Sequence, residues 1–274
     1  MAAADVMAIP KQEANMEQGN VQSIERAFSI METLSKSPDG LPLISISEAA
    51  GLHKSTVHRI LASLSSLGYV ERAGATGNYK LSLKMFEVSS RIVNGLDIYS
   101  AAKPCLDELS RLTDEAVHLV VRDGDEIIYV YKVDFSSGGV RMSSRIGLRA
   151  PMYCTAVGKC ILAHLPESEL CDIWERSKII ALTENTIITM DELKKELADI
   201  RNSGHAFDNE ENERGVKCIA APVFDYSGSI AGAFSVSIPT SRINDRKIEE
   251  FIPHIHSTMD KISRDMGYRP VDKR

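Results

Sequence analysis

The stretch of sequence best suited to a recognisable chemistry is basic, rich in hydroxyls and free of acids. No acidic residue occurs between Glu48 and Glu71. Within that window the polar side chains of interest are Lys54, Ser55, Thr56, His58 and Arg59. A cationic surface without carboxylates can displace counterions from phosphates, and the fork of an arginine matches the acceptor pair of guanine. These residues therefore predict contacts with the major groove of double-stranded DNA.

Apolar residues before and within this stretch recur at helical spacing. The first predicted helix has a one-sided stripe expected to be buried, formed by Val21, Ile24, Phe28, Met31 and Leu34. A short helix that ends at Gly51 and a longer helix that ends at Gly68 follow. Two helices joined by a tight turn are typical of a helix-turn-helix, in which one helix supports the other in a DNA groove.

The runs Tyr69–Arg72 and Tyr79–Leu81 flank a turn that contains glycines, and together they predict a short hairpin. This hairpin completes a winged helix-turn-helix over residues 20–82. Arg72 and Lys80 on the hairpin would mainly hold phosphates. A protein-binding winged helix, or a solvated helix face, would show a similar pattern, so the acid-free window is what favours DNA.

Length and charge exclude several classes of protein. The chain has 274 residues, a formal net charge of −6 and no apolar run long enough to cross a membrane, so it is neither a wholly basic nucleic-acid coat nor a membrane-spanning protein. Residues 20–82 contain six Lys/Arg and five Asp/Glu, a net of +1 that leaves −7 for the rest. Residues 1–18 resemble a disordered lead rather than a signal peptide. Five scattered cysteines without a secretory signal favour reduced thiols and a cytoplasmic location.

The rest of the chain predicts a connecting helix over residues 83–97 and an α+β domain with an antiparallel sheet over residues 98–268. Two hairpins are expected in this domain, formed by Ala116–Val121 with Glu126–Val133 and by Val216–Phe224 with Ser229–Ile238. Arg141–Ala150 is a candidate for a further strand. Pro166 is expected in the first turn of a helix, and Thr189 opens another with the spacing of a capping box.

Small polar residues on the predicted strands indicate a ligand site. Ser235 and Ser237 alternate with apolar residues and so share one face, and Cys218 lies on the partner strand. Such side chains leave room and can hydrogen-bond a small polar ligand, although simple packing of the sheet would give the same pattern. Residues 155–158 could begin a helix whose free N–H groups would suit a ligand carboxylate. The acid-rich run 208–213 is predicted to be mostly a solvated loop.

Signatures of common enzymes are missing from the sequence. Gly158-Lys159 suggests a phosphate-binding loop, but Tyr153 stands where that motif needs glycine and Cys160 where it needs Ser or Thr. Neither a G-x-S-x-G nor an H-E-x-x-H motif occurs. The cysteines and histidines show no paired ligand spacing. We therefore expect no catalytic residues, no metal and no cofactor.

Several motifs together resemble the IclR family of bacterial transcriptional regulators over residues 20–268. In the predicted winged helix-turn-helix the resemblance lies in residues 49–59. In the predicted α+β domain it lies in residues 156–159, 208–212 and 215–223. Residues 141–147 and 266–268 resemble the 2-keto-3-deoxygluconate regulon repressors within this family. Residues 67–70, 151–154 and 183–187 also resemble the diketogulonate-utilisation repressors.

This resemblance implies a winged-helix head, a connecting helix and a GAF-like effector domain, assembled as a homodimer or as a dimer of dimers. Motif matches place an effector pocket at Met142, Ala156, Val157, Asp208, Val216, Cys218, Ser235 and Ser237. The effector would be a small carboxylate, and both subgroups control sugar-acid catabolism. Ala156 stands where some relatives have glycine.

The expected function is a ligand-responsive transcription factor, a repressor that a small keto or sugar acid releases from a palindromic operator. A redox-sensing regulator that acts through Cys218 or Cys154 is one alternative. An activator of the same fold is another, since the sign of regulation depends on operator position. A metabolic enzyme with a degenerate helical head is a third, and it would need a catalytic constellation that the sequence lacks.

Overall fold

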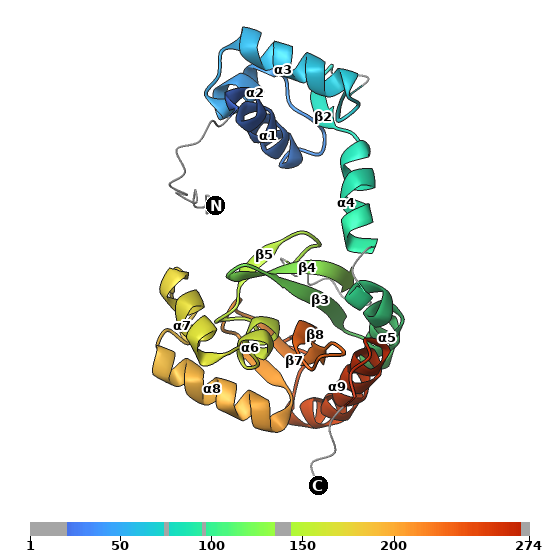
Figure 1. Cartoon of the computed structure of the whole chain (residues 1–274), viewed down its shortest axis with the longest axis vertical. Helices are drawn as coiled ribbons and strands as arrows, with labels where there is room; N and C mark the ends of the chain where they lie inside the picture. Colours follow the sequence, from blue (N-terminus) through green and yellow to red (C-terminus); the bar gives the residue numbers. More distant parts are fainter. Residues whose placement is uncertain (1–20, 74–76, 95–96, 135–143, 270–274) are drawn as a thin grey trace. The chain divides into compact units, whose positions relative to one another are not determined.

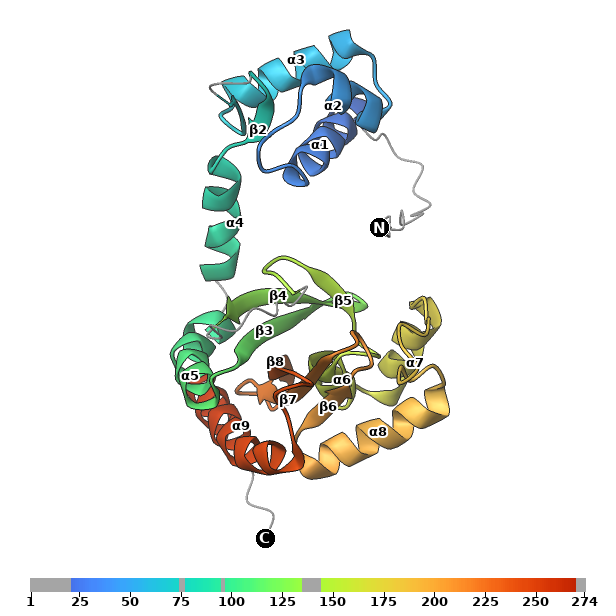
Figure 2. The same ribbon diagram turned by 180° about the vertical axis from the view of Figure 1, so that it is seen from behind.

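The computed structural model describes residues 21–73, 77–94, 97–134 and 144–269. Contacts between Cα atoms divide the chain into two compact units, one up to Ser90 and one from Arg91. Figures 1 and 2 show the elements of both units from opposite sides. In the part of the chain that is described, no helix combines the length and apolar character needed to cross a membrane.

The N-terminal unit is a winged helix-turn-helix, as the sequence predicts. Its elements are α1 (Gln22–Ser35), α2 (Leu43–Ala50), α3 (Lys54–Ser66), β1 (Val70–Arg72) and β2 (Tyr79–Leu81). Gly51 ends α2 with a left-handed backbone (φ +61°), which a residue with a Cβ adopts only at a cost. The two strands pair antiparallel and form the wing.

The predicted buried stripe of α1 is partly wrong. Ile30 and Leu34 face the core of the unit, whereas Val21, Ile24 and Phe28 are more than half exposed. The side of α1 that packs on the core is therefore the one with Ile30 and Leu34, and the side with Ile24 and Phe28 faces outward. Both sides satisfy a helical period, so periodicity alone could not say which one packs on α2 and α3. Leu67, the residue directly after α3, is also exposed.

The C-terminal unit is built on one six-stranded antiparallel sheet of order β5-β4-β3-β8-β7-β6. Its strands are β3 (Ala116–Asp123), β4 (Glu126–Val133), β5 (Arg149–Pro151), β6 (Ala206–Asn209), β7 (Val216–Phe224) and β8 (Ile230–Pro239). Both predicted hairpins are confirmed. The strand expected over 141–150 is confirmed only at its end, where Arg149 and Ala150 belong to β5: residues 144–148 are irregular, Gly147 turns with φ +83°, and residues 141–143 lie outside the described part.

Helices cover both faces of this sheet (Figures 1 and 2). One face holds α5 (Asp97–Thr113) and α9 (Asp245–Asp265); the other holds α6 (Ala156–Leu162), α7 (Glu167–Arg176) and α8 (Met190–Ser203). Thr189 caps α8 by accepting from the N–H of Glu192, as predicted. Pro166 stands at the N-cap of α7, one position earlier than expected. α4 (Lys84–Asn94) lies within the predicted connecting helix.

The two faces of the sheet differ in composition. The face under α5 and α9 is apolar and includes Val117, Leu119, Ile219, Phe234, Val236 and Ile238, all fully buried. The face under α6 alternates with it and carries small and polar residues. A strand turns successive side chains to opposite faces, so one run of residues supplies both surfaces.

Gly158 allows α6 to approach the strand connection that precedes it. A Cβ built on Gly158 would lie 2.4 Å from the Cα and carbonyl oxygen of Met152 and 2.6 Å from Thr155 Oγ1. Two of these three atoms belong to the backbone, which cannot move aside as a side-chain tip can. The glycine is therefore required by packing.

We expect Gly158→Ala to lower the free energy of unfolding by about 3 kcal/mol, because overpacking a dense interior forces the backbone to shift. Urea denaturation of the purified protein measures the change. Gly124→Ala is a suitable control, because nothing lies within 4 Å of its added Cβ. Its left-handed backbone alone should cost about 1 kcal/mol. Equal losses in the two variants would contradict the packing argument.

Candidate functional site

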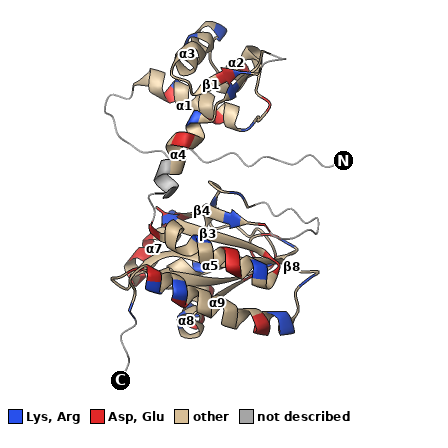
Figure 3. Ribbon diagram, turned by 90° about the vertical axis from the view of Figure 1, so that its right-hand side faces the viewer, with Lys and Arg blue, Asp and Glu red and all other residues tan. Residues whose placement is uncertain are grey.

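The outer face of α3 carries the residues predicted to meet DNA. Lys54, Ser55, His58 and Arg59 are exposed, and Thr56 is half-buried. The opposite face packs into the core through Val57, Leu61 and Leu64. No acidic side chain occurs on α3 (Figure 3). The helix therefore presents cationic and hydroxyl groups on a surface that its own core contacts hold in place.

The wing holds its two basic residues differently. The guanidinium of Arg72 lies over the ring of Tyr79, 4.6 Å from the centroid, and donates to the Tyr79 hydroxyl at 2.6 Å. The ammonium of Lys80 pairs with a carboxylate oxygen of Glu71 at 3.0 Å. An exposed pair of this kind is weak, so a phosphate can compete for Lys80. Arg72 is the more rigidly oriented of the two cations.

A group of polar side chains, most of them predicted to bind a ligand, lies on the α6-facing side of the large sheet. Strand register places it in two adjacent rows that run across the strands. One row aligns Asp208, Cys218 and Ser237, and the other aligns Ala220, Ser235 and His118. We call Asp208, Cys218, Ser235, Ser237 and His118 the polar cluster. The sequence predicted that Ser235 and Ser237 share a face and that Cys218 lies on the partner strand, and the register confirms both and aligns Cys218 with Ser237.

Hydrogen bonds connect much of the polar cluster. Cys218 Sγ lies 3.1 Å from Ser237 Oγ, and Ser237 Oγ lies 3.2 Å from His118 Nδ1. On its other side His118 Nε2 lies 2.8 Å from Ser144 Oγ. Sequence reasoning assigned no role to His118, an isolated histidine in an apolar strand, or to Ser144, which it noted only as part of the run 141–147. The strand alternation that marks Ser235 and Ser237 would have found His118.

The helix α6 packs on β6, β7 and β8, so its first turn faces the same side of the sheet as the polar cluster. Ala156 and Val157 in that turn are buried. The Thr155 hydroxyl caps the helix by accepting from the N–H of Gly158. Val216 begins β7 two residues before Cys218, on the same face, and is half-buried. Met142 lies outside the described residues.

The expectation of a solvated acidic loop is wrong for Asp208 and Glu211. Asp208 lies on β6 and is 5% exposed, and its Oδ1 accepts from the N–H groups of Glu211 at 2.7 Å and Asn212 at 3.4 Å. Burial raises the pKa of Asp208 to about 7. The two hydrogen bonds lower the pKa because they stabilise the charged form, but the effect of burial is larger. The segment folds inward because its carboxylates find partners there.

The partner of Glu211 is a fully buried lysine. Lys159 Nζ lies 2.6 Å from Glu211 Oε1 and 3.1 Å from Glu196 Oε1. Thr183 and Thr186 donate to the backbone carbonyls of Glu210 and Glu211 and anchor the same segment. Sequence reasoning rejected Lys159 as part of a phosphate loop and assigned it nothing else. An acidic run that needs a counter-charge was the signal that could have connected it to Glu211.

Burial keeps the cysteines near the polar cluster protonated. It raises the pKa of Cys154 to about 12, and it raises the pKa of Cys218 as well, with Asp208 adding to the effect in both cases. Cys154 lies 3.8 Å from Asn212 Oδ1, a weak hydrogen bond. A thiolate is the reactive form of cysteine, so neither thiol is prepared for redox chemistry in this state.

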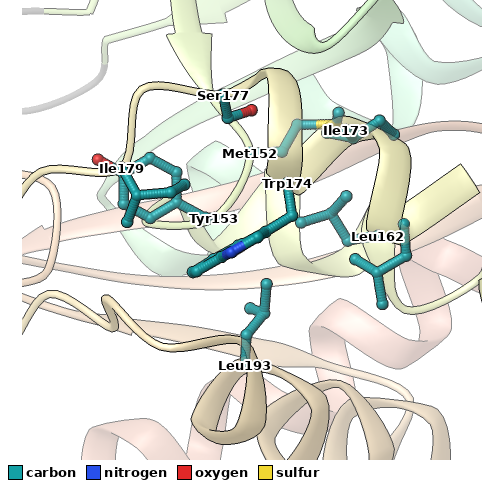
Figure 4. Close-up of a pocket in the computed structure, with 9 residues that line it drawn as sticks. Met152, Tyr153, Leu162, Ile173, Trp174, Ser177, Ile179 and Leu193 are labelled. Carbon is teal, nitrogen blue, oxygen red and sulfur yellow. The ribbon is translucent and has the colours of Figure 1, made fainter.

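A small apolar pocket lies among α6, α7 and α8 (Figure 4). It is lined by Met152, Tyr153, Leu162, Leu170, Ile173, Trp174, Ser177, Ile179 and Leu193. Its volume of about 10 Å³ has room for one water molecule at most. The ring of Trp174 meets Tyr153 edge to face, with centroids 6.1 Å apart. The pocket is a packing defect rather than a ligand site. Among the residues described, no group of three or more His, Cys, Asp or Glu could hold a metal ion.

A winged helix-turn-helix followed by an antiparallel-sheet unit with a buried polar cluster is the architecture of a DNA-binding regulator with a separate effector domain. Models of two domain families match this chain: the IclR helix-turn-helix domain at residues 23–74, and the bacterial transcriptional regulator IclR C-terminal domain at residues 90–264. The chain therefore belongs to the IclR family of transcriptional regulators, as its motifs had indicated.

Individual relatives resemble the chain over most of its length. The HTH-type transcriptional regulator KdgR of Escherichia coli K12 is 38% identical over 91% of this chain and 94% of its own. The DNA-binding transcriptional repressor YiaJ of the same organism is 40% identical, over 92% of this chain and 90% of its own. The crystal structure of the Thermotoga maritima IclR superposes with a TM-score of 0.81 at 33% identity, covering 90% of this chain and 99% of that one.

The raised pKa of Asp208 predicts a pH-dependent contribution to stability. The folded state holds this proton up to about pH 7, whereas an unfolded aspartate releases it near pH 4. The folded state therefore loses stability as the pH rises from about 4 to about 7. An asparagine side chain would still accept from both N–H groups without a charge, so we expect Asp208→Asn to be more stable than the wild type by about 3 kcal/mol at pH 8 and nearly equal at pH 4.

Urea denaturation of both proteins at several pH values measures this difference. Titrating groups that do not interact with Asp208 are common to the two proteins and cancel. Asp172→Asn, at an exposed position on α7, serves as the matched control and should show no such change. A difference between Asp208→Asn and the wild type that does not vary with pH would contradict the proposed protonation.

Proposed function

We propose that this protein is a cytoplasmic repressor of sugar-acid catabolism genes, released from its operator by a small keto or sugar acid. The observation that carries the proposal is the presence in one chain of an acid-free DNA-facing helix and a buried polar cluster. Matches to relatives named as a transcriptional regulator and a repressor support it. A cytoplasmic location follows from the need to reach DNA. We assign the chain no catalytic reaction.

In this proposal α3 enters the major groove. Ser55, Thr56, His58 and Arg59 face base edges or phosphates, and Arg59 is the direct reader because its fork matches guanine. Lys54 in the first turn of α3, together with Arg72 and Lys80 on the wing, holds the phosphates that set the register.

A homodimer, and a dimer of such dimers, would present the helices to a palindromic operator. Exposed apolar side chains support association of the N-terminal units. At the N-cap of α1 and on the helix these are Val21, Ile24 and Phe28, and around the start of α4 they are Leu83, Phe86 and Val88. With Ile44 and Leu67, the described part of this small unit exposes eight large apolar residues, more than single scattered positions would give. A second copy of the chain is the partner that we propose for them.

The effector would bind over the polar cluster, beside the first turn of α6. The residues proposed to line the site are Met142, Ala156, Val157, Asp208, Val216, Cys218, Ser235 and Ser237. Hydroxyl, thiol and carboxyl groups there suit the hydroxyl and keto oxygens of a sugar acid. Asp208 can hold a proton at neutral pH, which removes one negative charge from the neighbourhood of an anionic ligand.

Release from DNA requires the effector to prefer one arrangement of the heads. A hundredfold loss of operator affinity needs a coupling free energy of about 2.7 kcal/mol between the two sites. Residues 83–97 join the two domains in the chain, and we propose that they transmit this coupling.

Two alternative functions are a redox-sensing regulator and an activator of the same fold. A redox-sensing regulator would need an acidic, accessible thiol, and burial raises the pKa of Cys218 and Cys154 instead. An activator would use the same DNA contacts and differs only in operator position. A reporter gene under the natural operator, with and without the regulator, decides between activator and repressor.

We expect Arg59→Ala to weaken operator binding by about a hundredfold, because a bidentate contact with guanine contributes up to about 3 kcal/mol. Fluorescence anisotropy with labelled operator DNA measures the loss, and effector binding and unfolding should not change. Arg246→Ala, an exposed arginine on α9, is the matched control and should leave operator affinity intact. If Arg59→Ala reduces operator binding and stability together, Arg59 is structural.

A thermal-shift screen against 2-keto-3-deoxygluconate, diketogulonate and related acids tests the effector class. A ligand that binds the native state raises the melting temperature by mass action, and one that binds over the polar cluster should do so clearly. Ser235→Val should weaken calorimetric binding by about tenfold through loss of a hydrogen bond. Its operator affinity without ligand should not change. Unaltered ligand binding by Ser235→Val would remove Ser235 from the site, and no shift with any acid would refute the class.

A further inference from the structure

His118 lies in the middle of the sheet with a hydroxyl group at each ring nitrogen. The side chain is 2% exposed, and its Nδ1 faces Ser237 Oγ while its Nε2 faces Ser144 Oγ. The chain of contacts continues from Ser237 Oγ to Cys218 Sγ. It therefore links β7, β8 and β3 to the segment that leads into β5.

The surroundings hold the imidazole neutral and in one orientation. Burial and the nearby charge of Lys132 lower the pKa of His118 to about 4. The ring packs edge to face against Tyr129, with centroids 5.4 Å apart. Lys132 Nζ donates to the backbone carbonyl of Ser144 at 2.8 Å and so fixes that residue beside the ring.

A neutral imidazole has one N–H donor and one lone-pair acceptor. His118 can therefore donate to only one of its two hydroxyl neighbours, and it must accept from the other. With the proton on Nδ1, His118 donates to Ser237, and Ser144 donates to Nε2. Ser237 can then point its own hydrogen at a ligand when the Cys218 thiol is the donor in their contact. With the proton on Nε2, Ser237 gives its hydrogen to the ring and can only accept from a ligand.

We propose that His118 is a positioning residue, which sets whether Ser237 donates or accepts toward the effector and passes that choice on to Ser144. This inference rests on the proposed role of Ser237 in effector binding. A keto or carboxylate oxygen at Ser237 needs a donor and selects the Nδ1–H tautomer. The site thereby favours ligands with an acceptor oxygen at this position, and their binding changes the hydrogen bonding of Ser144 on the other side of the ring.

Two conservative variants test separately the contact of His118 with Ser237 and its contact with Ser144. The amide of asparagine lies near the position of imidazole Nδ1, and the amide of glutamine lies near that of Nε2. His118→Asn should retain the contact with Ser237 and bind 2-keto-3-deoxygluconate within about threefold of the wild type. His118→Gln should retain only the contact with Ser144 and lose about tenfold, the effect of one hydrogen bond.

A double-mutant cycle with Ser237→Ala distinguishes positioning from general support of the fold. If His118 acts through Ser237, His118→Gln causes no further loss of calorimetric affinity in the Ser237→Ala background. A tenfold loss that persists in that background overturns the proposal. Equal losses in His118→Asn and His118→Gln also overturn it.

Side-chain ¹⁵N spectra of the full-length protein, labelled at its seven histidines, test the tautomer without any ligand. The signal that disappears in His118→Gln identifies His118. We expect a neutral ring between pH 6 and 8, with its proton on Nε2 in Ser237→Ala and on Nδ1 in Ser144→Ala, because each substitution leaves a partner at only one nitrogen. A tautomer that neither substitution changes refutes the proposal. Failure of every sugar acid to bind the wild type would refute the effector class instead, and these spectra would still decide the role of His118.

Discussion

The effector domain depends on the ion pairs that the buried ammonium of Lys159 makes with two carboxylates. The ammonium contacts Glu211 after β6 and Glu196 on α8, so a single charge joins three elements. Removing one partner of a buried ion pair costs about 3 to 5 kcal/mol, because the remaining charge has lost its solvent and its counter-charge. Glu211 in turn donates its backbone N–H to Asp208. The position of a proposed effector-binding carboxyl is therefore set by an ion pair that need not touch the ligand.

The two faces of the large sheet divide stability from recognition. Under α5 and α9 the strands bury large apolar side chains such as Leu119 and Phe234, which supply the hydrophobic free energy that a domain requires. Under α6 the same strands present Ala220 and Ser235, which bury little area. Small side chains are tolerated on that face because the opposite one is densely packed. This division leaves His118 and Ser237 free to be selected for hydrogen bonding.

Local pattern explains most of what the sequence could predict. The amphipathic helix α3, the hairpins and the cap at Thr189 each depend on residues close in the chain, and the structure has them where the pattern places them. The buried side of α1 and the inward fold of Asp208 depend on distant partners, and pattern alone misassigned them. Lys159 and His118 gain their roles only from tertiary contacts. The sequence therefore indicated the family more clearly than it indicated how the site is built.

The distribution of charge affects how much free energy an effector must supply to release the protein from DNA. Residues 20–82 have a net charge of only +1 in a chain of −6, so in the proposed DNA complex attraction to phosphates would arise from a few side chains on α3 and the wing. A strongly basic protein would stay on DNA through many counterion-releasing contacts, whatever its ligand did. For a head of net charge +1 we expect a small non-specific component, so that misplacing a few contacts would remove much of the affinity. A coupling of about 1 to 3 kcal/mol, the usual range for linked sites, is then enough for control.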